Sequence, residues 1–193
     1  MPGATLRLAV IIGSVRDGRF GPTVADWFVE QAKVHGEFAL DLVDLVDSPL
    51  QVAMRMGSDS EAAASPNTVS PALAAADAFV VVTPEYNHSF PASLKAAIDW
   101  HHGEWHAKPV GFVSYGGMSG GLRAVEHLRQ VFAELHAMTV RDTVSFHNPW
   151  SDFGEQDSPS TGEVELAAKR MLDQLVWWAD ALREARSEQP YVG

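Results

Sequence analysis

Cysteine is absent from this chain of 193 residues. Disulfide bonds, thiolate nucleophiles and cysteine-ligated metal sites are therefore excluded. Long apolar runs are also missing, and because the longest are only strand-sized, we expect no membrane span. The N-terminus has neither the basic flank nor the apolar core of a secretory signal before Leu6 opens a strand-like segment. These absences favour a cytoplasmic protein.

Basic residues are scarce, with 14 Lys and Arg against 25 Asp and Glu, for a formal net charge of −11. Such a surface repels nucleic acids and anionic membranes, so we expect neither as a partner. No run of like charge is long enough to form an acidic tail. At this length, residues 1–193 are expected to form one domain with its own core.

Most of the chain alternates strand-like apolar segments with helical patterns. Five segments are predicted to be strands: residues 6–12, 38–43, 78–83, 110–114 and 139–145. The last has a weaker pattern, because Arg141 and Asp142 interrupt it, and its alternation fits a strand at an edge of the sheet. The helical patterns lie near Val24, Pro91, Leu122 and Ala168. This alternation predicts an α/β fold, a parallel sheet with helices on both faces.

Two long segments, residues 44–70 and 146–161, do not follow this alternation. The first is rich in Ser, Asp, Pro and Gly, and the second carries aromatic residues among turn formers. Loops of this length in a compact domain are usually functional or interfacial.

A glycine-rich loop follows the first predicted strand. It reads Gly13-Ser14-Val15-Arg16-Asp17-Gly18-Arg19-Phe20-Gly21-Pro22 and leads directly into a helical pattern. Glycines let backbone N–H groups converge, and the helix dipole favours an anion at this end. Ser14 adds a hydroxyl donor, while Arg16 and Arg19 add positive charge. The loop predicts a phosphate site, with a plain turn bearing two solvated arginines as the alternative.

Two better-known phosphate motifs do not match this loop. A Walker loop needs Lys and then Ser or Thr after the second glycine, where this chain has Arg19 and Phe20. The dinucleotide fingerprint G-x-G-x-x-G fails because position 15 is Val. Without that fingerprint, a ribose-binding role is not assigned to the acids near the second strand, which are Asp41, Asp44 and Asp47.

The third predicted strand ends in chemically distinct residues. An apolar run up to Thr83 is followed at once by Pro84, Glu85, Tyr86 and Asn87. Pro84 cannot extend the strand ladder, Tyr86 offers a flat face, and Asn87 offers both a donor and an acceptor. Open α/β sheets bind ligands at the carboxyl ends of their strands. The alternative is an ordinary strand-to-helix turn, in which Pro and Asn are common.

A third unusual loop, Ser114-Tyr115-Gly116-Gly117-Met118-Ser119-Gly120-Gly121, follows the fourth predicted strand. Its glycines indicate either a backbone that approaches another group closely or a flexible turn. In a doubly wound sheet of order 2-1-3-4-5, the loops after strands 1, 3 and 4 open onto one crevice. A planar mononucleotide such as FMN fits this crevice better than a dinucleotide does.

Three motifs together resemble the NAD(P)H-dependent FMN reductase family, which is flavodoxin-like and includes quinone, azo-dye and chromate reductases. They are G-S-x-R-x-G after the first strand, P-E-Y-N-x-S-x-P-x-x-L-K-x-A-I-D-W at 84–100 and S-Y-G-x-x-x-G-G at 114–121. The resemblance covers roughly residues 5–145, and the middle motif is highly specific. It implies a five-stranded flavodoxin-like sheet of order 2-1-3-4-5.

The resemblance also implies cofactor-binding residues. The FMN phosphate and ribityl chain would be held by Ser14, Arg16, Gly18, Arg19, Phe20 and Gly21. The isoalloxazine would be lined by Pro84, Glu85, Tyr86 and Asn87, and closed on its other side by Ser114, Tyr115 and Gly116. Some relatives carry Ser and Asn at positions 19 and 21.

The predicted activity is transfer of hydride from NADPH or NADH through bound FMN to a small-molecule acceptor. The cofactor carries this chemistry, so no catalytic side chain is assigned. A flavodoxin-like electron carrier without NAD(P)H turnover is the alternative, and a sensor that lacks flavin is a third. Arg55 and Arg123 are candidates for contact with a 2′-phosphate. A homo-oligomer is expected, because long aromatic and Met-bearing flanks need covering, and the resemblance implies a homodimer or homotetramer.

No metal site is predicted. The spacing of His101, His102, Glu104 and His106 does not match H-E-x-x-H, and a helix end with surface histidines is preferred. The pairs Trp100/Trp105 and Trp177/Trp178 are expected in the core or at oligomer contacts.

Overall fold

The computed structural model describes residues 5–48, 50, 69–153, 159 and 162–192. Its strands are β1 (Leu6–Ile12), β2 (Phe38–Asp44), β3 (Ala78–Pro84), β4 (Pro109–Gly116), β5 (Met138–Thr139) and β6 (Val144–His147). Its helices are α1 (Gly21–His35), the 3-10 helix η1 (Leu45–Asp47), α2 (Ser70–Ala75), α3 (Ala92–Asp99), α4 (Leu122–Glu134), α5 (Pro149–Asp152) and α6 (Gly162–Glu188). The parallel sheet has the order β2-β1-β3-β4-β5, with β6 also paired to β4, which confirms the predicted doubly wound fold.

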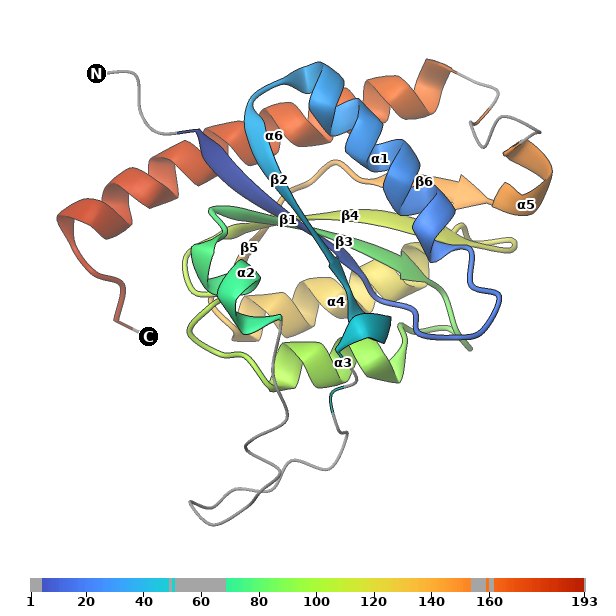
Figure 1. Cartoon of the computed structure of the whole chain (residues 1–193), viewed down its shortest axis with the longest axis horizontal. Helices are drawn as coiled ribbons and strands as arrows, with labels where there is room; N and C mark the ends of the chain where they lie inside the picture. The colour runs from blue at the N-terminus through green and yellow to red at the C-terminus, as the bar shows by residue number, and fades with distance from the viewer. Residues whose placement is uncertain (1–4, 49, 51–68, 154–158, 160–161, 193) are drawn as a thin grey trace, which may run out of the picture.

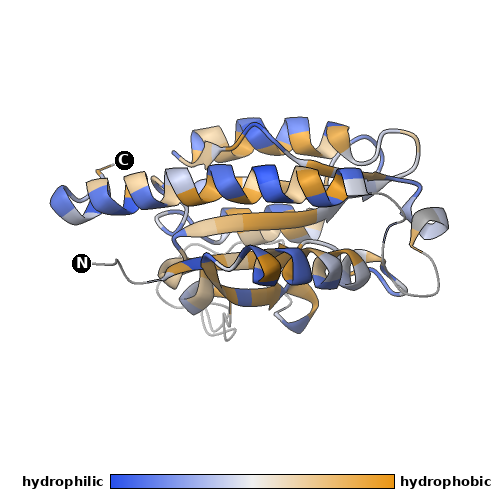
Figure 2. Cartoon of the chain, turned by 90° about the horizontal axis from the view of Figure 1, so that it is seen from above, coloured by the Kyte–Doolittle hydropathy of each residue, from blue (hydrophilic) through white to orange (hydrophobic). Residues whose placement is uncertain are grey.

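Helices cover both faces of the sheet, and an apolar core lies against each face (Figure 1). In β1, Leu8 and Val10 point toward α1 and α6, whereas Ala9 and Ile11 point toward α2, α3 and α4. The central strands β3 and β4 are buried at every residue, as their near-continuous apolar sequences predict. In Figure 2 the strands of the sheet are mostly hydrophobic, while the helices alternate hydrophobic with hydrophilic residues.

The predicted edge strand 139–145 is divided into β5 and β6. The flanking pairs with β4 are Val110 with Thr139 and Val113 with Val144. The edge strand therefore has two residues more than β4 between these pairs, and the ladder is interrupted as in a bulge. Arg129 of α4 donates to the carbonyl oxygens of Val140 at 2.8 Å and Arg141 at 3.0 Å. Backbone carbonyl groups at this break therefore receive their hydrogen bonds from α4.

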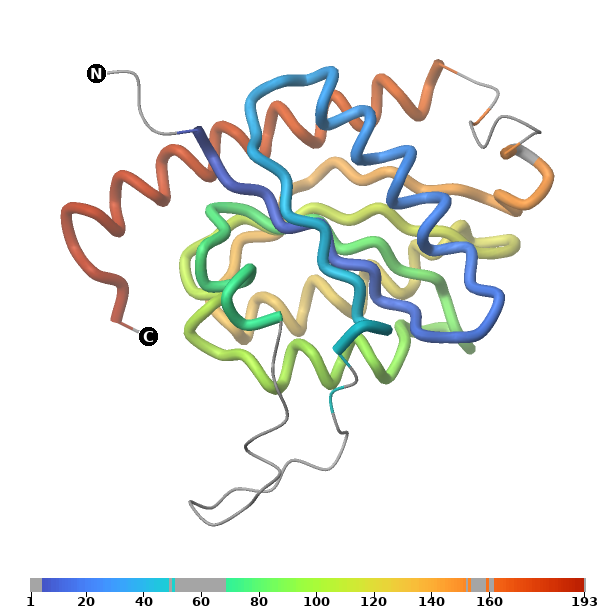
Figure 3. The backbone as a smooth tube through the Cα atoms, in the orientation of Figure 1, coloured from blue at the N-terminus to red at the C-terminus, as the bar shows by residue number. Residues whose placement is uncertain are grey.

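The loops after β1, β3 and β4 lie together at the carboxyl edge of the sheet, on the right of Figure 3. Helix α1 begins at this edge and ends near the opposite one. The three sequence-predicted loops are therefore neighbours in space, as the strand order requires.

The two long segments are described in part. Residues 49 and 51–68 of the first, and 154–158, 160 and 161 of the second, lie outside the described residues. Trp105 is fully buried in a core, whereas the side chain of Trp177 is 62% exposed. Within the ranges that the structure describes, no helix combines the length and apolar character needed to cross a membrane.

Candidate functional site

A cleft of about 590 Å³ opens at the carboxyl edge between the loop after β1 and the segment after β3. It is lined by Val15, Arg16, Glu85, Tyr86, Asn87, Pro91, Ala92 and Ser93. The sequence did not assign the start of α3 to the site. Ser93 Oγ donates to the carbonyl oxygen of Gly13 at 2.6 Å and ties α3 to the glycine-rich loop. The only sequence signal was that residues 91–93 lie inside the motif at 84–100.

Buried hydroxyl groups join two of the predicted loops. Ser14 is fully buried, and its Oγ lies 2.7 Å from the hydroxyl oxygen of Tyr86. Tyr115 is also buried, and its pKa is raised because burial disfavours the phenolate and because Tyr86 lies nearby. Tyr115 therefore remains a neutral hydroxyl at ordinary pH.

The two arginines of the glycine-rich loop take different positions. Arg19 donates to both carboxylate oxygens of Asp44, at 2.5 and 2.7 Å, and to the carbonyl oxygen of Ser14 at 2.9 Å. The hydrogen bond to Asp44 is the main reason that the pKa of Arg19 is raised. Arg16 is exposed, with its guanidinium carbon 6.0 Å from the ring centre of Tyr86. Over the part of the chain that the structure describes, the Arg16 guanidinium has no hydrogen-bond or ion-pair partner.

The start of α1 packs closely beneath this loop. A Cβ on Gly21 would lie 2.9 Å from Ile12 Cγ2 and 3.1 Å from the Tyr115 hydroxyl oxygen, so a side chain at this position would have to displace one of these groups. Gly18 has a φ of +66°, in the left-handed region that favours glycine. Phe20 precedes the helix and provides no side-chain cap. Pro22 has no N–H, and the Val24 N–H donates to the Phe20 carbonyl oxygen, which leaves the Gly21 and Thr23 N–H groups as the donors that this turn offers to an anion.

Residues 86–89 form a two-residue hairpin at the end of β3. The Tyr86 and Ser89 backbones exchange hydrogen bonds of 2.8 and 3.0 Å. Between them, Asn87 and His88 have φ values of +50° and +73°, as a type I′ turn requires. The hairpin holds the exposed Asn87 side chain at the rim of the cleft.

Glu85 connects this hairpin to the loop after β4 and to α4. Its carboxylate accepts hydrogen bonds from Ser119 Oγ at 2.5 Å, from the Arg123 backbone N–H at 3.3 Å and from the Arg123 guanidinium at 3.0 Å. Burial opposes ionisation of Glu85, but Ser119 and Arg123 together lower its pKa below the usual value. The sequence did not assign Ser119, although a hydroxyl among glycines was a usable signal.

The glycines after β4 pack closely against β4 itself. Ser114 Oγ donates to the carbonyl oxygen of Gly120 at 2.8 Å, and a Cβ on Gly121 would lie 2.7 Å from Ser114 Cβ. A Cβ on Gly116 would lie 3.2 Å from the Gly121 nitrogen. The close approach that these glycines indicate therefore folds the loop onto β4, which fixes Ser119 beneath Glu85.

The histidines near residue 101 make protein contacts. His101 is buried rather than on the surface, with Nε2 2.9 Å from Ser70 Oγ and Nδ1 2.7 Å from the Ala97 carbonyl oxygen. Burial, and then the neighbouring His102, lower the pKa of His106. Among the residues described, no group of three or more His, Asp or Glu side chains is arranged to hold a metal ion.

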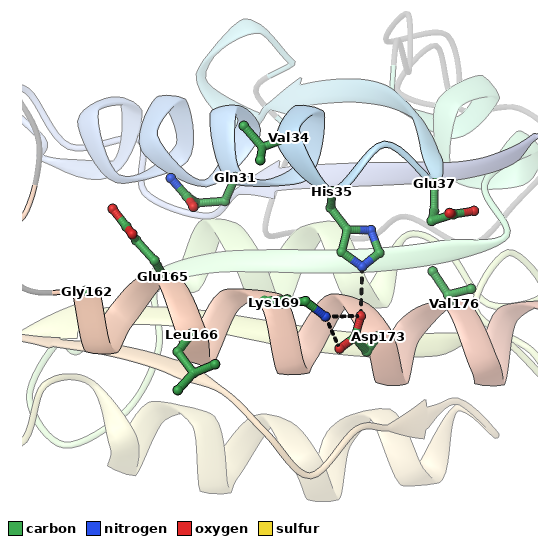
Figure 4. Close-up of a pocket in the computed structure, with 10 residues that line it drawn as sticks. All are labelled: Gln31, Val34, His35, Glu37, Gly162, Glu165, Leu166, Lys169, Asp173 and Val176. Carbon is green, nitrogen blue, oxygen red and sulfur yellow. Dashed lines mark hydrogen bonds and ion pairs between the residues drawn. The ribbon is translucent and has the colours of Figure 1, made fainter.

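A second groove, of about 870 Å³, lies between α1 and α6 (Figure 4). Its central polar groups pair with one another: His35 Nε2 lies 3.0 Å, and Lys169 Nζ 2.7 Å, from the oxygens of Asp173. The groove is near the end of α1, whereas the predicted loops meet at its start. We therefore place the candidate site in the smaller cleft, which the loops after β1 and β3 line directly and which the loop after β4 adjoins through the contact of Ser119 with Glu85.

Comparisons with known proteins identify the same family. The model of the NADPH-dependent FMN reductase family matches residues 6–151. An NAD(P)H-dependent FMN reductase of Schizosaccharomyces pombe is 42% identical over 122 residues, which cover 61% of this chain and 61% of that protein, less than two thirds of its length. A quinone reductase of Escherichia coli is 34% identical over 140 residues, covering 70% of this chain and 73% of that protein.

A solved structure supports the fold. The flavoenzyme NAD(P)H:(acceptor) oxidoreductase FerB of Paracoccus denitrificans matches with a TM-score of 0.67 and 21% identity, covering 91% of this chain and 98% of that one.

Proposed function

The chain belongs to the NADPH-dependent FMN reductase family, and we propose that it binds FMN in the cleft at the carboxyl edge. In this proposal NADPH or NADH is the electron donor, and the acceptor is a small molecule such as a quinone, an azo compound, free flavin or a metal oxyanion. The observation that carries it is the Arg16 guanidinium, which is exposed and has no hydrogen-bond or ion-pair partner among the described residues, in the loop that leads into the uncapped start of α1. A phosphate placed there would meet a cation and backbone donors together.

The residues of the cleft fit one mononucleotide. Arg16 and the first turn of α1 would hold the phosphate, and the Ser14 hydroxyl would add a neutral donor. Tyr86 and Asn87, held by the hairpin, would line the flavin ring with an aromatic face and an amide. Arg19 would support the loop through Asp44 rather than contact the phosphate.

When bound, FMN supplies the redox chemistry of the reaction, accepting hydride from nicotinamide and passing electrons to the acceptor. The chain supplies position and exclusion of water. Glu85 is ionised and engaged by Ser119 and Arg123, and Tyr115 is neutral and buried, so neither is poised to exchange a proton with a substrate. We therefore assign no catalytic acid or base.

We expect heat treatment to release non-covalent FMN, and turnover to follow a ping-pong mechanism. Because the cleft has one open side, donor and acceptor should bind to it one after the other, so double-reciprocal plots of NADPH oxidation with a quinone should be parallel.

Tyr86→Ala should change the kinetic parameters of the donor and of the acceptor together, because it removes the aromatic face that lines the flavin ring. Released FAD, or a chain that does not take up FMN, would contradict the cofactor assignment, and intersecting lines would contradict the single site. Bound FMN without NADPH or NADH oxidation would indicate an electron carrier.

We also propose a homo-oligomer, either a dimer or a pair of dimers. Large apolar side chains are exposed at the carboxyl edge, namely Val15 at 41%, Met118 at 89%, Leu122 at 43% and Trp150 at 61%. Exposed apolar surface of this kind usually forms an interface.

Light scattering should therefore give a mass that is a multiple of 21.0 kDa. Met118→Glu should dissociate the assembly, because it puts a charge into the apolar surface. Val34→Glu is the matched control, since Val34 is 86% exposed but lies in the last turns of α1. A monomer of the wild-type chain at micromolar concentration would refute the proposal.

A further inference from the structure

A second group of basic side chains lies on the α4 side of the hairpin. His88 stands at the hairpin tip, and its ring centre is 6.2 Å from that of His127 on α4. His127 Nδ1 lies 3.0 Å from Ser89 Oγ, at one end of the hairpin. Arg123 binds Glu85, the residue just before the hairpin. Two basic residues of one helix thus hold the hairpin and the residue that leads into it.

Arg123 and His127 are four residues apart, so they lie on the same face of α4. Both are exposed, as is His88. The acidic neighbour Glu126 pairs with Arg129, at 3.4 Å, and not with this group. Arg123 uses one guanidinium nitrogen for Glu85, and its side chain is still 45% exposed. Since a guanidinium has five N–H donors in a planar fork, its outer edge can bind a second anion.

This group is separated from Arg16 by the hairpin itself. Strand β3 lies between β1 and β4 in the sheet, so the hairpin has the Arg16 loop on one side and α4 on the other. The nicotinamide donor is an anion, and it approaches a chain whose formal net charge is −11. If Arg16 is occupied by the phosphate of FMN, the donor needs other positive groups near the cleft.

The backbone of His88 provides an independent observation. The second central position of a type I′ turn favours glycine, yet His88 occupies it with a φ of +73°. Backbone strain of this kind clusters at binding sites, so the His88 side chain is a candidate for a role in binding.

We propose that His88, Arg123 and His127 form the subsite that binds a phosphate group of the nicotinamide donor. This inference rests on the proposed function, since it requires bound FMN and a dinucleotide donor. The phosphate is either the pyrophosphate that NADH and NADPH share or the 2′-phosphate that only NADPH carries. Binding there would hold the adenylate end of the donor over α4 while the nicotinamide end enters the cleft.

The test uses the FMN-loaded enzyme and the single variants His88→Gln and His127→Gln, with Arg123→Lys as a variant that keeps a charge next to Glu85. Rapid mixing with NADPH or NADH gives the apparent Kd of the donor and the rate of flavin reduction at saturation. Titration with adenosine 2′,5′-bisphosphate measures binding without turnover. Lys33→Gln is the matched control, because it removes one exposed charge in the last turn of α1.

Each histidine variant should weaken donor binding about two- to tenfold, as expected for the loss of one hydrogen bond to phosphate. The change should fall on the Kd and not on the rate at saturation. Weakening of both donors would assign the pyrophosphate, and weakening of NADPH and the bisphosphate alone would assign the 2′-phosphate.

Unchanged Kd values for both donors in all three variants would overturn the subsite. That result, with FMN bound and reduced normally, would leave the proposed function intact. A wild-type chain that binds no FMN, or binds it without being reduced by either donor, would instead overturn the proposed function.

Discussion

Replacement of Arg16 by Ala is expected to weaken FMN binding roughly 10- to 100-fold, because a charge-assisted hydrogen bond contributes about 1.5–3 kcal/mol. The exposed Arg16 guanidinium has no hydrogen-bond or ion-pair partner among the described residues, so its loss should leave the folded chain intact. Titration of the apoprotein with FMN, followed by flavin fluorescence, measures the Kd. The melting temperature of the apoprotein should stay within error of wild type.

The neighbouring arginine provides the contrast. Arg19→Ala removes both hydrogen bonds to the Asp44 carboxylate, and the side chains of this pair are only 16% and 17% exposed. This variant should lower the melting temperature of the apoprotein, whereas Arg16→Ala should not. The FMN affinity of Arg16→Lys should fall between those of Arg16→Ala and the wild type, since lysine keeps the charge but lacks the planar fork of N–H donors of the guanidinium. An unchanged Kd for Arg16→Ala would place this residue outside the phosphate site.

These two arginines show where sequence-based prediction of the site ends. Both lie in the same loop, and local chemistry gives each the same expected role. The difference comes from Asp44, which is 25 positions from Arg19 in the chain and reaches it only because β1 and β2 are adjacent. A partner set by strand pairing is not visible in the loop's own sequence.

The fold itself was predictable because its signals are local. The buried strands β3 and β4 are near-continuous apolar runs, and each ends where Pro or Gly interrupts the run. One strand was predicted over residues 139–145, and its division into β5 and β6 was missed, since the break depends on Arg129 of α4 binding the carbonyl groups of Val140 and Arg141. Burial of His101 was also missed, because its partner Ser70 lies on another helix.

The glycines after β4 were predicted to allow a close approach, but the sequence does not identify what they approach. Gly121 has a φ of +85°, and a Cβ there would lie 2.7 Å from Ser114 Cβ and 2.9 Å from the Tyr115 nitrogen. These are atoms of a buried central strand, which cannot move aside as a flexible side chain can. The loop is therefore shaped by contact with β4.

Gly121→Ala should for this reason destabilise the protein more than any other change proposed here. A left-handed backbone costs an alanine about 1–2 kcal/mol, and overpacking of a tight core adds about 1–3 kcal/mol, for a loss of about 2–5 kcal/mol. For a chain of this size, the melting temperature should fall by roughly 4–20 °C. Thermal and denaturant unfolding of the apoprotein measure both quantities.

The same substitution should also weaken FMN binding, since displacement of the loop takes Ser119 away from Glu85 and releases the hairpin that carries Tyr86. Gly117→Ala is the matched control in the same loop, because a Cβ there meets only Asn148 Oδ1, at an ordinary 3.7 Å. This control should keep wild-type stability and FMN affinity. Equal effects of the two substitutions would mean that the loop needs flexible glycines in general, and the specific contact between Gly121 and β4 would lose its role in shaping the site.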